Sequence, residues 1–302
     1  MQFSTNNPGY KIYAKVATAL FRLYDTFFRP AFPPVVRIES TNICNASCTT
    51  CPRDQLTRKP GVMDFDLFQK IIDECAAHKT HRIHLHNFGE PLIDRELTKK
   101  ISYAKDRGMK VRVFSNLSLL TEELAQGLVS SGLDDIKISF DGYTRETFEN
   151  IRRRLKFEDV VHNIRLLIDT KNRMGSSTPK VGLTFVETPE NSHEKELFLK
   201  EWKGMADNTI ITKYHNWGGK VISHAQAKLI PCPRIWSTLT VLWNGDVALC
   251  CLDFDGSVIL GNVRTQSIAD IYQSDKINDI RNFHLTWQYS RIPICSDCSL
   301  RK

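Results

Sequence analysis

Apolar and polar residues follow two different periods along most of the chain, and segments of the two kinds alternate. Short runs with a polar residue at every second position predict strands, and longer segments with apolar residues three or four positions apart predict helices. The predicted strands cover residues 35–41, 82–89, 110–116, 135–141, 180–187 and 209–215. The predicted helices cover residues 65–77, 95–106, 122–131, 145–153, 157–174 and 194–204. Six strand–helix units predict an α/β fold, a partial (β/α)6 barrel with the helices outside a parallel sheet.

Polar side chains recur at alternating positions of several predicted strands. Strands buried on both faces of a parallel sheet are usually continuous apolar runs. The alternation therefore predicts a barrel interior that binds a polar ligand, although each residue alone fits a buried structural role equally well. The residues concerned are Arg37, Glu39, His84, His86, Lys137, Ser139, Asp141, Lys213 and His215.

An amphipathic segment precedes the first strand. Residues 11–29 combine an apolar stripe, flanking aromatic residues and a basic opposite face, which predicts a helix that ends before Pro30. Two interpretations fit this pattern. The helix packs across one end of the barrel, or it lies on a membrane surface or a lipid substrate.

Composition and charge narrow the class of protein. With 41% hydrophobic and 25% charged residues among 302, the chain reads as a globular protein of one large or two ordinary domains. The formal charge of +7 is compatible with an anionic substrate, and no Lys/Arg run resembles a nucleic-acid tail. We find no apolar run of about 18 residues and no secretory signal, so we expect a cytoplasmic protein. Nine cysteines in a reducing compartment, seven of them tightly spaced, indicate metal ligation rather than disulfides.

Three cysteines directly follow the first predicted strand. They are Cys44, Cys48 and Cys51, with the spacing C-x3-C-x2-C. A closed zinc or iron–sulfur site normally has four protein ligands. Three thiolates therefore leave one coordination position for something else. On the residues alone, a zinc site with one distant ligand is the alternative to an iron–sulfur cluster.

In this position the three cysteines resemble the cluster motif of the radical S-adenosylmethionine superfamily. Three further segments agree in order and position: NFGEPLID, VFSN and ISFDG, each at the end of a predicted strand. The resemblance covers residues 35–215. It implies that the cysteines hold three irons of a [4Fe–4S] cluster, and that the amino and carboxylate groups of S-adenosylmethionine chelate the fourth.

The resemblance also implies contacts to S-adenosylmethionine, position by position. They are Gly89, Glu90 and Pro91 for the amino group, Ser115 and Asn116 for the ribose, Ser139 and Asp141 near the ligand, and Arg152 for the carboxylate. Two positions depart from the family pattern. Phe88 replaces the first glycine of its GGEP segment, and Thr50 stands where an aromatic residue often lies beside the adenine.

A second cysteine group lies in the last third of the chain. It consists of Cys232, Cys250, Cys295 and Cys298. Residues 237–251 read as a hairpin around Asn244-Gly245, a dipeptide favoured in tight primed turns, which would return Cys250 towards Cys232. From spacing alone, structural zinc is an alternative.

The C-x12-G-x4-C spacing of this group resembles the SPASM extension in its shortened twitch form, and is nearest to that of the 2-deoxy-scyllo-inosamine dehydrogenases. The resemblance implies one auxiliary [4Fe–4S] cluster with four protein ligands. Cys251 follows Cys250 directly, and adjacent strand residues point to opposite faces. Cys251 is therefore a core residue or a thiol near the active site, and Cys75, in a predicted helix, is a buried apolar residue.

These observations predict three segments and one preferred activity. Residues 1–34 form an N-terminal helix, 35–224 the barrel and 225–302 the auxiliary domain. The resemblance implies a 5′-deoxyadenosyl radical that abstracts hydrogen from a small-molecule alcohol, with the auxiliary cluster accepting an electron. The base that removes the hydroxyl proton is one of His84, His86, Lys137 and His215. A flavodoxin- or ferredoxin-type protein would reduce the first cluster.

Three other activities stay open. The enzyme could be an epimerase, with Cys251 as hydrogen donor, or a peptide-modifying enzyme. It could also modify a lipid or envelope precursor, which the N-terminal helix suggests. A two-zinc scaffold without catalysis is the alternative from another class.

Overall fold

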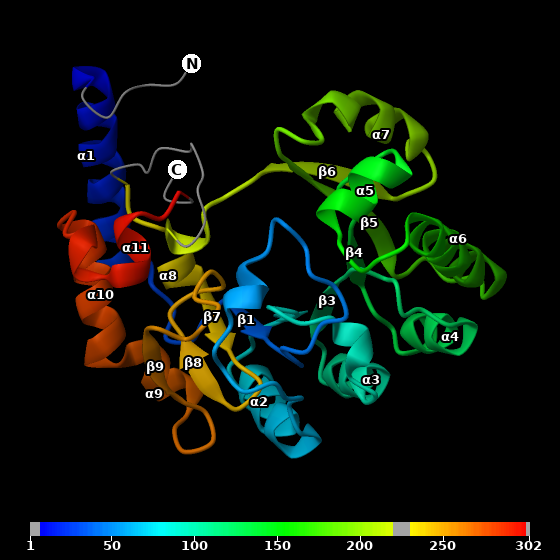
Figure 1. The fold of residues 1–302 in the computed structure, drawn as a ribbon. Coiled ribbons are helices and arrows are strands. Elements are labelled where there is room, and N and C mark those ends of the chain that lie inside the picture. The colour runs from blue at the N-terminus through cyan, green and yellow to red at the C-terminus, as the bar shows by residue number, and fades with distance from the viewer. Residues whose placement is uncertain (1–6, 220–229, 300–302) are drawn as a thin grey trace. The chain divides into compact units, whose positions relative to one another are not determined.

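The computed structural model describes residues 7–219 and 230–299, which fall into two compact units (Figure 1). One unit consists of Arg37–Tyr214 and Leu242–Asn244 and is called the barrel unit below. The other combines the described parts of Met1–Val36, His215–Val241 and Gly245–Lys302 and is called the terminal unit. The predicted boundary at residue 224 lies outside the described residues.

The barrel unit contains the predicted sequential sheet. Its strands are β1 (Val35–Ile38), β2 (Arg82–Leu85), β3 (Lys110–Ser115), β4 (Asp135–Ser139), β5 (Lys180–Glu187) and β6 (Asn208–Lys213), and the first two residues of β1 fall in the terminal unit. They neighbour one another in chain order, and the pairs from β2–β3 to β5–β6 are parallel. The predicted α/β fold is confirmed.

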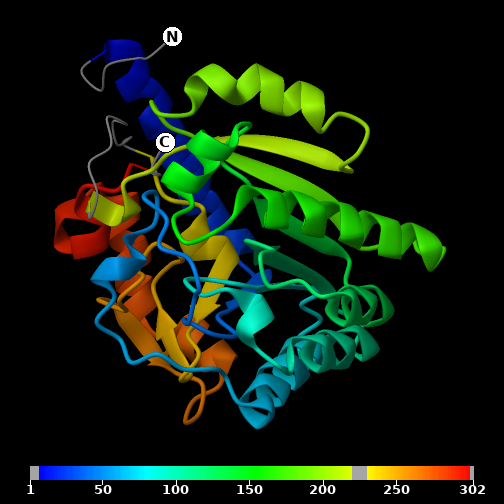
Figure 2. The ribbon, with the colours of Figure 1, turned by 45° about the vertical axis from the view of Figure 1, so that its right-hand side comes forward.

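Helices cover the outer face of this sheet (Figure 2). They are α2 (Phe65–Ala77), α3 (Leu97–Asp106), α4 (Glu122–Ser130), α5 (Arg145–Ile151), α6 (Phe157–Arg173) and α7 (Lys195–Glu201). Three of them begin after a residue whose side chain accepts a hydrogen bond from the first turn: Asp64, Thr121 and Thr144. Phe140, just after β4, packs among aromatic rings of α5, α6 and Trp202, with ring centroids 4.9 to 5.6 Å apart.

Five strands end earlier than predicted, and the difference is largest for β1 and β2, whose following residues make contacts in the loop after β1. β1 ends at Ile38 because Ser40 O accepts from Met63 N at 2.8 Å, which draws the chain into an antiparallel contact with residues 61–63. β2 ends at Leu85 because the following segment crosses to the loop after β1. Both departures occur at the carboxyl ends of the strands, where the cysteine loop lies.

The terminal unit contains a small antiparallel sheet and short helices. Its elements are α1 (Pro8–Leu23), a π-helical turn (Tyr24–Phe28), α8 (Arg234–Ser237), β7 (Thr238–Val241), β8 (Asp246–Ala248), β9 (Ile259–Asn262), α9 (Ile268–Gln273), α10 (Asp275–Leu285) and α11 (Pro293–Ser296). Strand β7 pairs with β8 as predicted, but four residues connect them, and Gly245 has φ +96° while Asn244 has no positive φ. The connection is therefore not a two-residue primed turn.

Helix α1 packs on the terminal unit through its small and polar face. Tyr10, Ala14 and Thr18 are its buried residues, and Trp287 Nε1 donates to Thr18 Oγ1 at 2.9 Å. The predicted apolar stripe faces outward instead: Ile12, Val16, Leu20, Leu23 and Phe27 are 51 to 71% exposed. No described helix is long and apolar enough to cross a bilayer.

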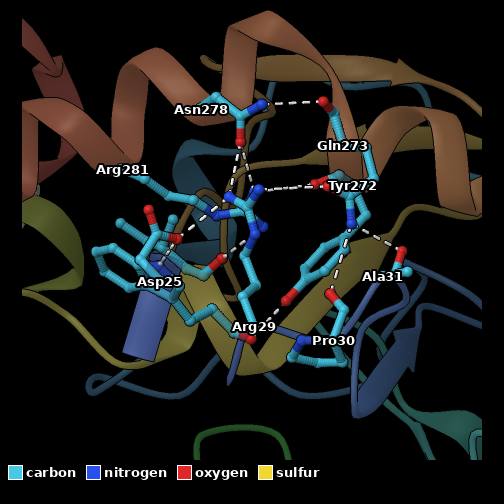
Figure 3. Close-up of polar contacts among 10 residues, drawn as sticks. Asp25, Arg29, Pro30, Ala31, Tyr272, Gln273, Asn278 and Arg281 are labelled. Carbon is cyan, nitrogen blue, oxygen red and sulfur yellow. Dashed lines mark hydrogen bonds and ion pairs between the residues drawn. The ribbon is translucent and has the colours of Figure 1, made fainter. Parts of the chain in front are cut away.

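A polar network fixes the end of this N-terminal segment (Figure 3). Arg29 Nη1 donates to Asn278 Oδ1 at 2.9 Å and also contacts Asp25 Oδ1 at 3.2 Å. The Arg281 side chain, which is buried, donates to the same Asn278 oxygen and to Tyr272 O. The segment before β1 is therefore held against α9 and α10 by specific hydrogen bonds.

Candidate metal and cofactor centres

The first three cysteines lie in the loop that follows β1. The backbone of this loop is anchored on the end of α5, because Ser47 N donates to Arg153 O at 3.1 Å and Thr49 N donates to Ile151 O at 2.9 Å. The three thiols are close enough to influence one another's charge. They belong to Cys44, Cys48 and Cys51.

The segment after β2 lies directly against this loop. A Cβ atom on Gly89 would lie 2.1 Å from Thr41 O and 2.9 Å from Ile43 O, so only glycine allows the two backbones to approach this closely. Glu90 N donates to Ile43 O at 2.9 Å. The predicted cofactor segment therefore meets the cysteine loop through its backbone.

The Glu90 side chain ties this segment to the end of β3. Its carboxylate accepts from Ser115 Oγ at 2.6 Å, Asn116 N at 2.7 Å and Leu92 N at 3.1 Å. Burial raises the pKa of Glu90, against the effect of these hydrogen bonds. Since Ser115 Oγ also accepts from Leu117 N at 2.8 Å, a ribose contact would require that hydroxyl to exchange a partner.

Asn116 links β3 to the first cysteine. Its amide nitrogen donates to Asn45 Oδ1 at 3.0 Å and to the Cys44 sulfur at 3.9 Å. Its amide oxygen accepts from the backbone and hydroxyl of Ser118 at 3.0 and 2.7 Å. Asn116 thus positions the cysteine loop, a role that sequence reasoning did not assign to it.

Arg152 reaches the same loop from the end of α5. Its guanidinium lies 2.5 Å from Asp141 Oδ2 and donates to the Cys48 sulfur at 3.7 Å. Burial would lower the pKa of Arg152, but interactions with Asp141 first and then Cys48 outweigh it and raise the pKa. Its buried Nε has no hydrogen-bond partner within the described residues. A charged guanidinium with an open donor at a cysteine loop fits the predicted ligand carboxylate.

The donor set fits an iron–sulfur cluster with one open position. Burial raises the pKa of Cys44 and Cys48, and raises that of Cys51 to about 12. Such thiols stay protonated unless a metal replaces the proton. Three of them in one loop, beside a glycine cradle and Arg152, match a [4Fe–4S] cluster that chelates a further ligand.

Two predicted bases lie together on the inner face of the sheet. The rings of His84 and His86 are 5.8 Å apart, and both nitrogens of His84 and Nδ1 of His86 are buried without a hydrogen-bond partner in the described chain. Burial and the nearby Arg37 lower the pKa of both histidines, that of His84 to about 3. Both rings are therefore neutral at pH 7, and His84 is a weak base.

The other three candidates lie elsewhere. Lys137 is paired, with its Nζ 3.0 Å from Asp135 Oδ1 and 2.8 Å from Asn208 Oδ1, so its nitrogen is already engaged. His215 belongs to the terminal unit, where its ring contacts Trp217 at 4.3 Å. Cys251 belongs to that unit too.

On β4, Ser139 is paired in register with Thr184. It lies two residues after Lys137 and two residues before Asp141. Its predicted place near the ligand stays a prediction, as does that of Pro91. Pro91 begins a short 3-10 turn directly after Glu90.

The second cysteine group lines one pocket of the terminal unit. Burial raises the pKa of Cys232 and Cys250, as expected for thiols that lose their protons only when they bind a metal. The lining residues are Cys232, Cys250, Cys295 and Cys298 together with Arg234, Ile235, Leu249, Leu252 and Ile294. Four thiols in a largely apolar pocket fit a fully ligated cluster. Across residues 7–219 and 230–299, no three His, Cys, Asp or Glu side chains are placed to share a single metal ion.

Asn216 and Arg234 have roles at this pocket that were not predicted from the sequence. Asn216 holds the Cys298 segment, since its side chain donates to Asp297 O at 2.6 Å and accepts from Ser299 N at 2.9 Å. Burial would lower the pKa of Arg234, but the electrostatic effect of the neighbouring cysteines outweighs it and raises the pKa, so a positive charge lines the pocket. Cys251 itself is half-buried and does not line the pocket.

Two family models match the chain. The radical SAM superfamily model matches residues 38–183, and the SPASM model, an iron–sulfur cluster-binding domain, matches residues 232–299. The seven cysteines of the two groups all lie within these ranges.

Two curated relatives align along most of the chain. One is a tungsten-containing aldehyde ferredoxin oxidoreductase cofactor-modifying protein of Pyrococcus furiosus, 24% identical over 87% of this chain and 86% of its own length. The other is the S-adenosyl-L-methionine-dependent 2-deoxy-scyllo-inosamine dehydrogenase of Niallia circulans, 22% identical over 88% and 92%.

Solved structures show the same fold at low identity. The crystal structure of BtrN in complex with AdoMet and 2-DOIA has a TM-score of 0.62 at 19% identity, covering 88% of this chain and 92% of that one. Streptococcus suis SuiB bound to S-adenosylmethionine has a TM-score of 0.71 at 12% identity, covering 87% and 71%.

Proposed function

Because the chain belongs to the radical S-adenosylmethionine superfamily and carries a C-terminal SPASM domain, we propose that it oxidises a small-molecule alcohol by two electrons. The predicted family is confirmed, and with it the cofactors: the radical SAM domain binds S-adenosylmethionine and a [4Fe–4S] cluster, and the SPASM domain binds further iron–sulfur. When bound, the first cluster and its ligand supply a 5′-deoxyadenosyl radical that removes a hydrogen atom from the substrate.

The observation that carries this proposal is the pocket lined by Cys232, Cys250, Cys295 and Cys298. A cluster with four protein ligands has no iron free for substrate, so its natural role is electron transfer. Oxidation of an alcohol requires such an acceptor for the electron that remains after hydrogen abstraction. The similarity to a dehydrogenase over most of both chains supports the same reaction class.

Each of the site residues has its own role in the proposed reaction. The Gly89–Glu90 backbone and Arg152 hold the methionine end of S-adenosylmethionine, and Asp141 keeps Arg152 charged and oriented. The hydroxyl proton goes to His86 or His84, which are neutral, rather than to the paired Lys137. A flavodoxin- or ferredoxin-type protein supplies electrons to the first cluster. Residues 35–224 act as the catalytic barrel and 225–302 as the auxiliary domain.

The test is a stoichiometry measured on anaerobically reconstituted protein with candidate alcohols. We expect one 5′-deoxyadenosine per ketone, with deuterium moving from the carbinol carbon of a labelled substrate into that nucleoside. Epimerisation would instead put solvent deuterium on the substrate carbon without net oxidation. That result would replace the dehydrogenase proposal with the epimerase.

A second candidate concerns where the substrate is found. The outward apolar stripe of α1, with the exposed Lys11 and Lys15 beside it, favours contact with an anionic membrane surface and hence a lipid or envelope precursor as substrate.

Liposome flotation tests this candidate. We expect the protein to float with vesicles that contain anionic lipid, and the double variant Leu20→Asp, Phe27→Asp to remain in the bottom fraction. The matched control Leu197→Asp alters an exposed apolar residue of α7 and should float like the wild type. Equal flotation of all three proteins, or of none, removes the membrane from the proposal.

A further inference from the structure

Basic and imidazole side chains gather on the inner face of the first three strands of the barrel unit. Val36, Ile83 and Val111 are buried towards the helices, so the residue after each of them points to the opposite face. These following residues are Arg37, His84 and Arg112. His84 and Arg112 are paired in register on β2 and β3, and Arg37 is near enough to lower the pKa of His84 and His86.

The carboxylates in this region do not balance the positive charges. Asp135 is shared, since it accepts from Arg112 Nε at 2.6 Å and lies 3.0 Å from Lys137 Nζ. Glu39, on the inner face beyond Arg37, is engaged by both terminal nitrogens of Arg58 at 2.8 Å. Two cations thus share one carboxylate, and Arg37 is left over.

Arg37 has open hydrogen-bond donors as well as an unbalanced charge. Its Nε and Nη1 are buried and without a partner among the described residues, and no ion pair is found for it there. A buried donor without a partner destabilises the folded protein, and a buried charge without a counter-charge destabilises it more. Water could satisfy the donors, but it would not neutralise the charge. An arginine fork matches the two oxygens of a carboxylate or phosphate.

We propose that Arg37, with His84 beside it, binds an anionic group of the substrate on the inner face of the barrel, which leaves His86, two residues nearer the Gly89–Glu90 segment, as the base for the hydroxyl proton. The inference rests on the proposed function and narrows its substrate to a small alcohol that carries a carboxylate or a phosphate ester. The relative from Niallia circulans is named for an inosamine, which carries an amino group, so the two substrates would differ in charge.

The spacing along the strands sets the length of such a molecule. Arg112 on β3 precedes Asn116, the residue after the end of that strand, by four residues. At about 3.3 Å per residue, Arg112 lies about 13 Å before this predicted cofactor contact. A substrate that is anchored at Arg37 and reaches the cofactor must therefore be elongated, longer than a single sugar ring. The anion would also offset the charge of Arg37, which adds to burial in lowering the pKa of both histidines.

Calorimetry on the reconstituted protein with S-adenosylmethionine tests the proposal. Inorganic phosphate and D-gluconate are the two probes, each compared with chloride at equal ionic strength. We expect saturable binding of one probe, and the probe that binds identifies the substrate as a phosphate ester or a carboxylate. Absence of saturable binding of both probes to the wild type would overturn the proposal without any variant.

Variants locate the site. Arg37→Gln should weaken the binding of that probe about a hundredfold, as expected for the loss of two charge-assisted hydrogen bonds. Arg37→Lys keeps the charge without the fork and should bind with intermediate affinity. Arg145→Gln removes an exposed arginine of α5 and should bind like the wild type. If Arg37→Gln, Arg37→Lys and the wild type bind the probe with equal affinity, the anion does not bind at Arg37 and the inference is wrong.

The binding assay does not depend on ketone formation. Arg37-dependent binding in a protein that forms no ketone would overturn the dehydrogenase and leave the anion site standing. Ketone formation that is equally fast in Arg37→Gln and in the wild type would overturn the anion site and leave the dehydrogenase standing.

Discussion

Cys48→Ala should abolish the cleavage of S-adenosylmethionine and lower the iron content from about eight to about four per chain. Cys48 is one of three thiols in the loop after β1. Among the described residues we assign no further protein ligand that could replace it at that cluster. Its sulfur also accepts the hydrogen bond from Arg152, so the variant disturbs both the cluster and the cofactor carboxylate site. The measurements are 5′-deoxyadenosine formed under strong reductant, and iron and sulfide per chain.

Cys75→Ala is the matched control for this loss. Cys75 is fully buried on α2 and has a raised pKa caused by that burial, but it lies in neither cysteine group. We expect unchanged iron and unchanged nucleoside formation. Undiminished cleavage in Cys48→Ala, or a wild type that holds about four irons or fewer, would contradict the assignment of two clusters.

The elements of the barrel follow from residue pattern because each strand buries one face against its helix. Ile83, Val111 and Ile136 keep the two-residue period that packing on the outer helices requires. The cysteine positions were equally accessible to prediction, since ligand chemistry demands particular residues at short spacing. What the pattern predicts is therefore local: which face is buried, and which short segment binds metal.

Contacts between segments that are distant in the sequence could not be predicted from it. Nothing local shows that Glu90 accepts three hydrogen bonds from β3 and its own turn, or that Asn116 reaches Cys44. Arg37 looked like one of several alternating polar residues, and its missing counter-charge became visible only when Glu39 was found engaged by Arg58. A signal for Arg112 did exist, because it continues the alternation of β3, yet its partner Asp135 lies on another strand.

Helix α1 shows the limit of amphipathic patterns. Its apolar stripe allowed either a packed face or a face on a membrane surface, and the terminal unit buries Tyr10, Ala14 and Thr18 rather than the stripe. The reason is specific polar contact: Thr18 pairs with Trp287, and Asp25 accepts from Trp236 Nε1 at 2.6 Å. Those contacts fix the rotation of the helix more strongly than the apolar stripe does.

Cys295→Ala should separate cofactor cleavage from substrate oxidation. The change removes one of the four thiols that line the pocket of the terminal unit and leaves the cysteine loop of the barrel unit untouched. We expect iron to fall by about four per chain, 5′-deoxyadenosine formation to continue, and ketone formation to fall below detection. Iron analysis and product quantification on the same preparation measure all three.

The variant Cys251→Ala distinguishes the dehydrogenase from the epimerase. Cys251 adjoins Cys250 but does not line the pocket, so we expect this variant to keep its iron and, under the dehydrogenase proposal, its ketone formation. If the wild type instead forms an epimer without net oxidation, and Cys251→Ala keeps its iron but loses that product, the thiol donates hydrogen and the enzyme is an epimerase. If Cys295→Ala forms ketone at the wild-type rate, the second cluster does not accept the substrate electron. The first cluster, which has three protein thiols and one open iron, would then have to accept that electron.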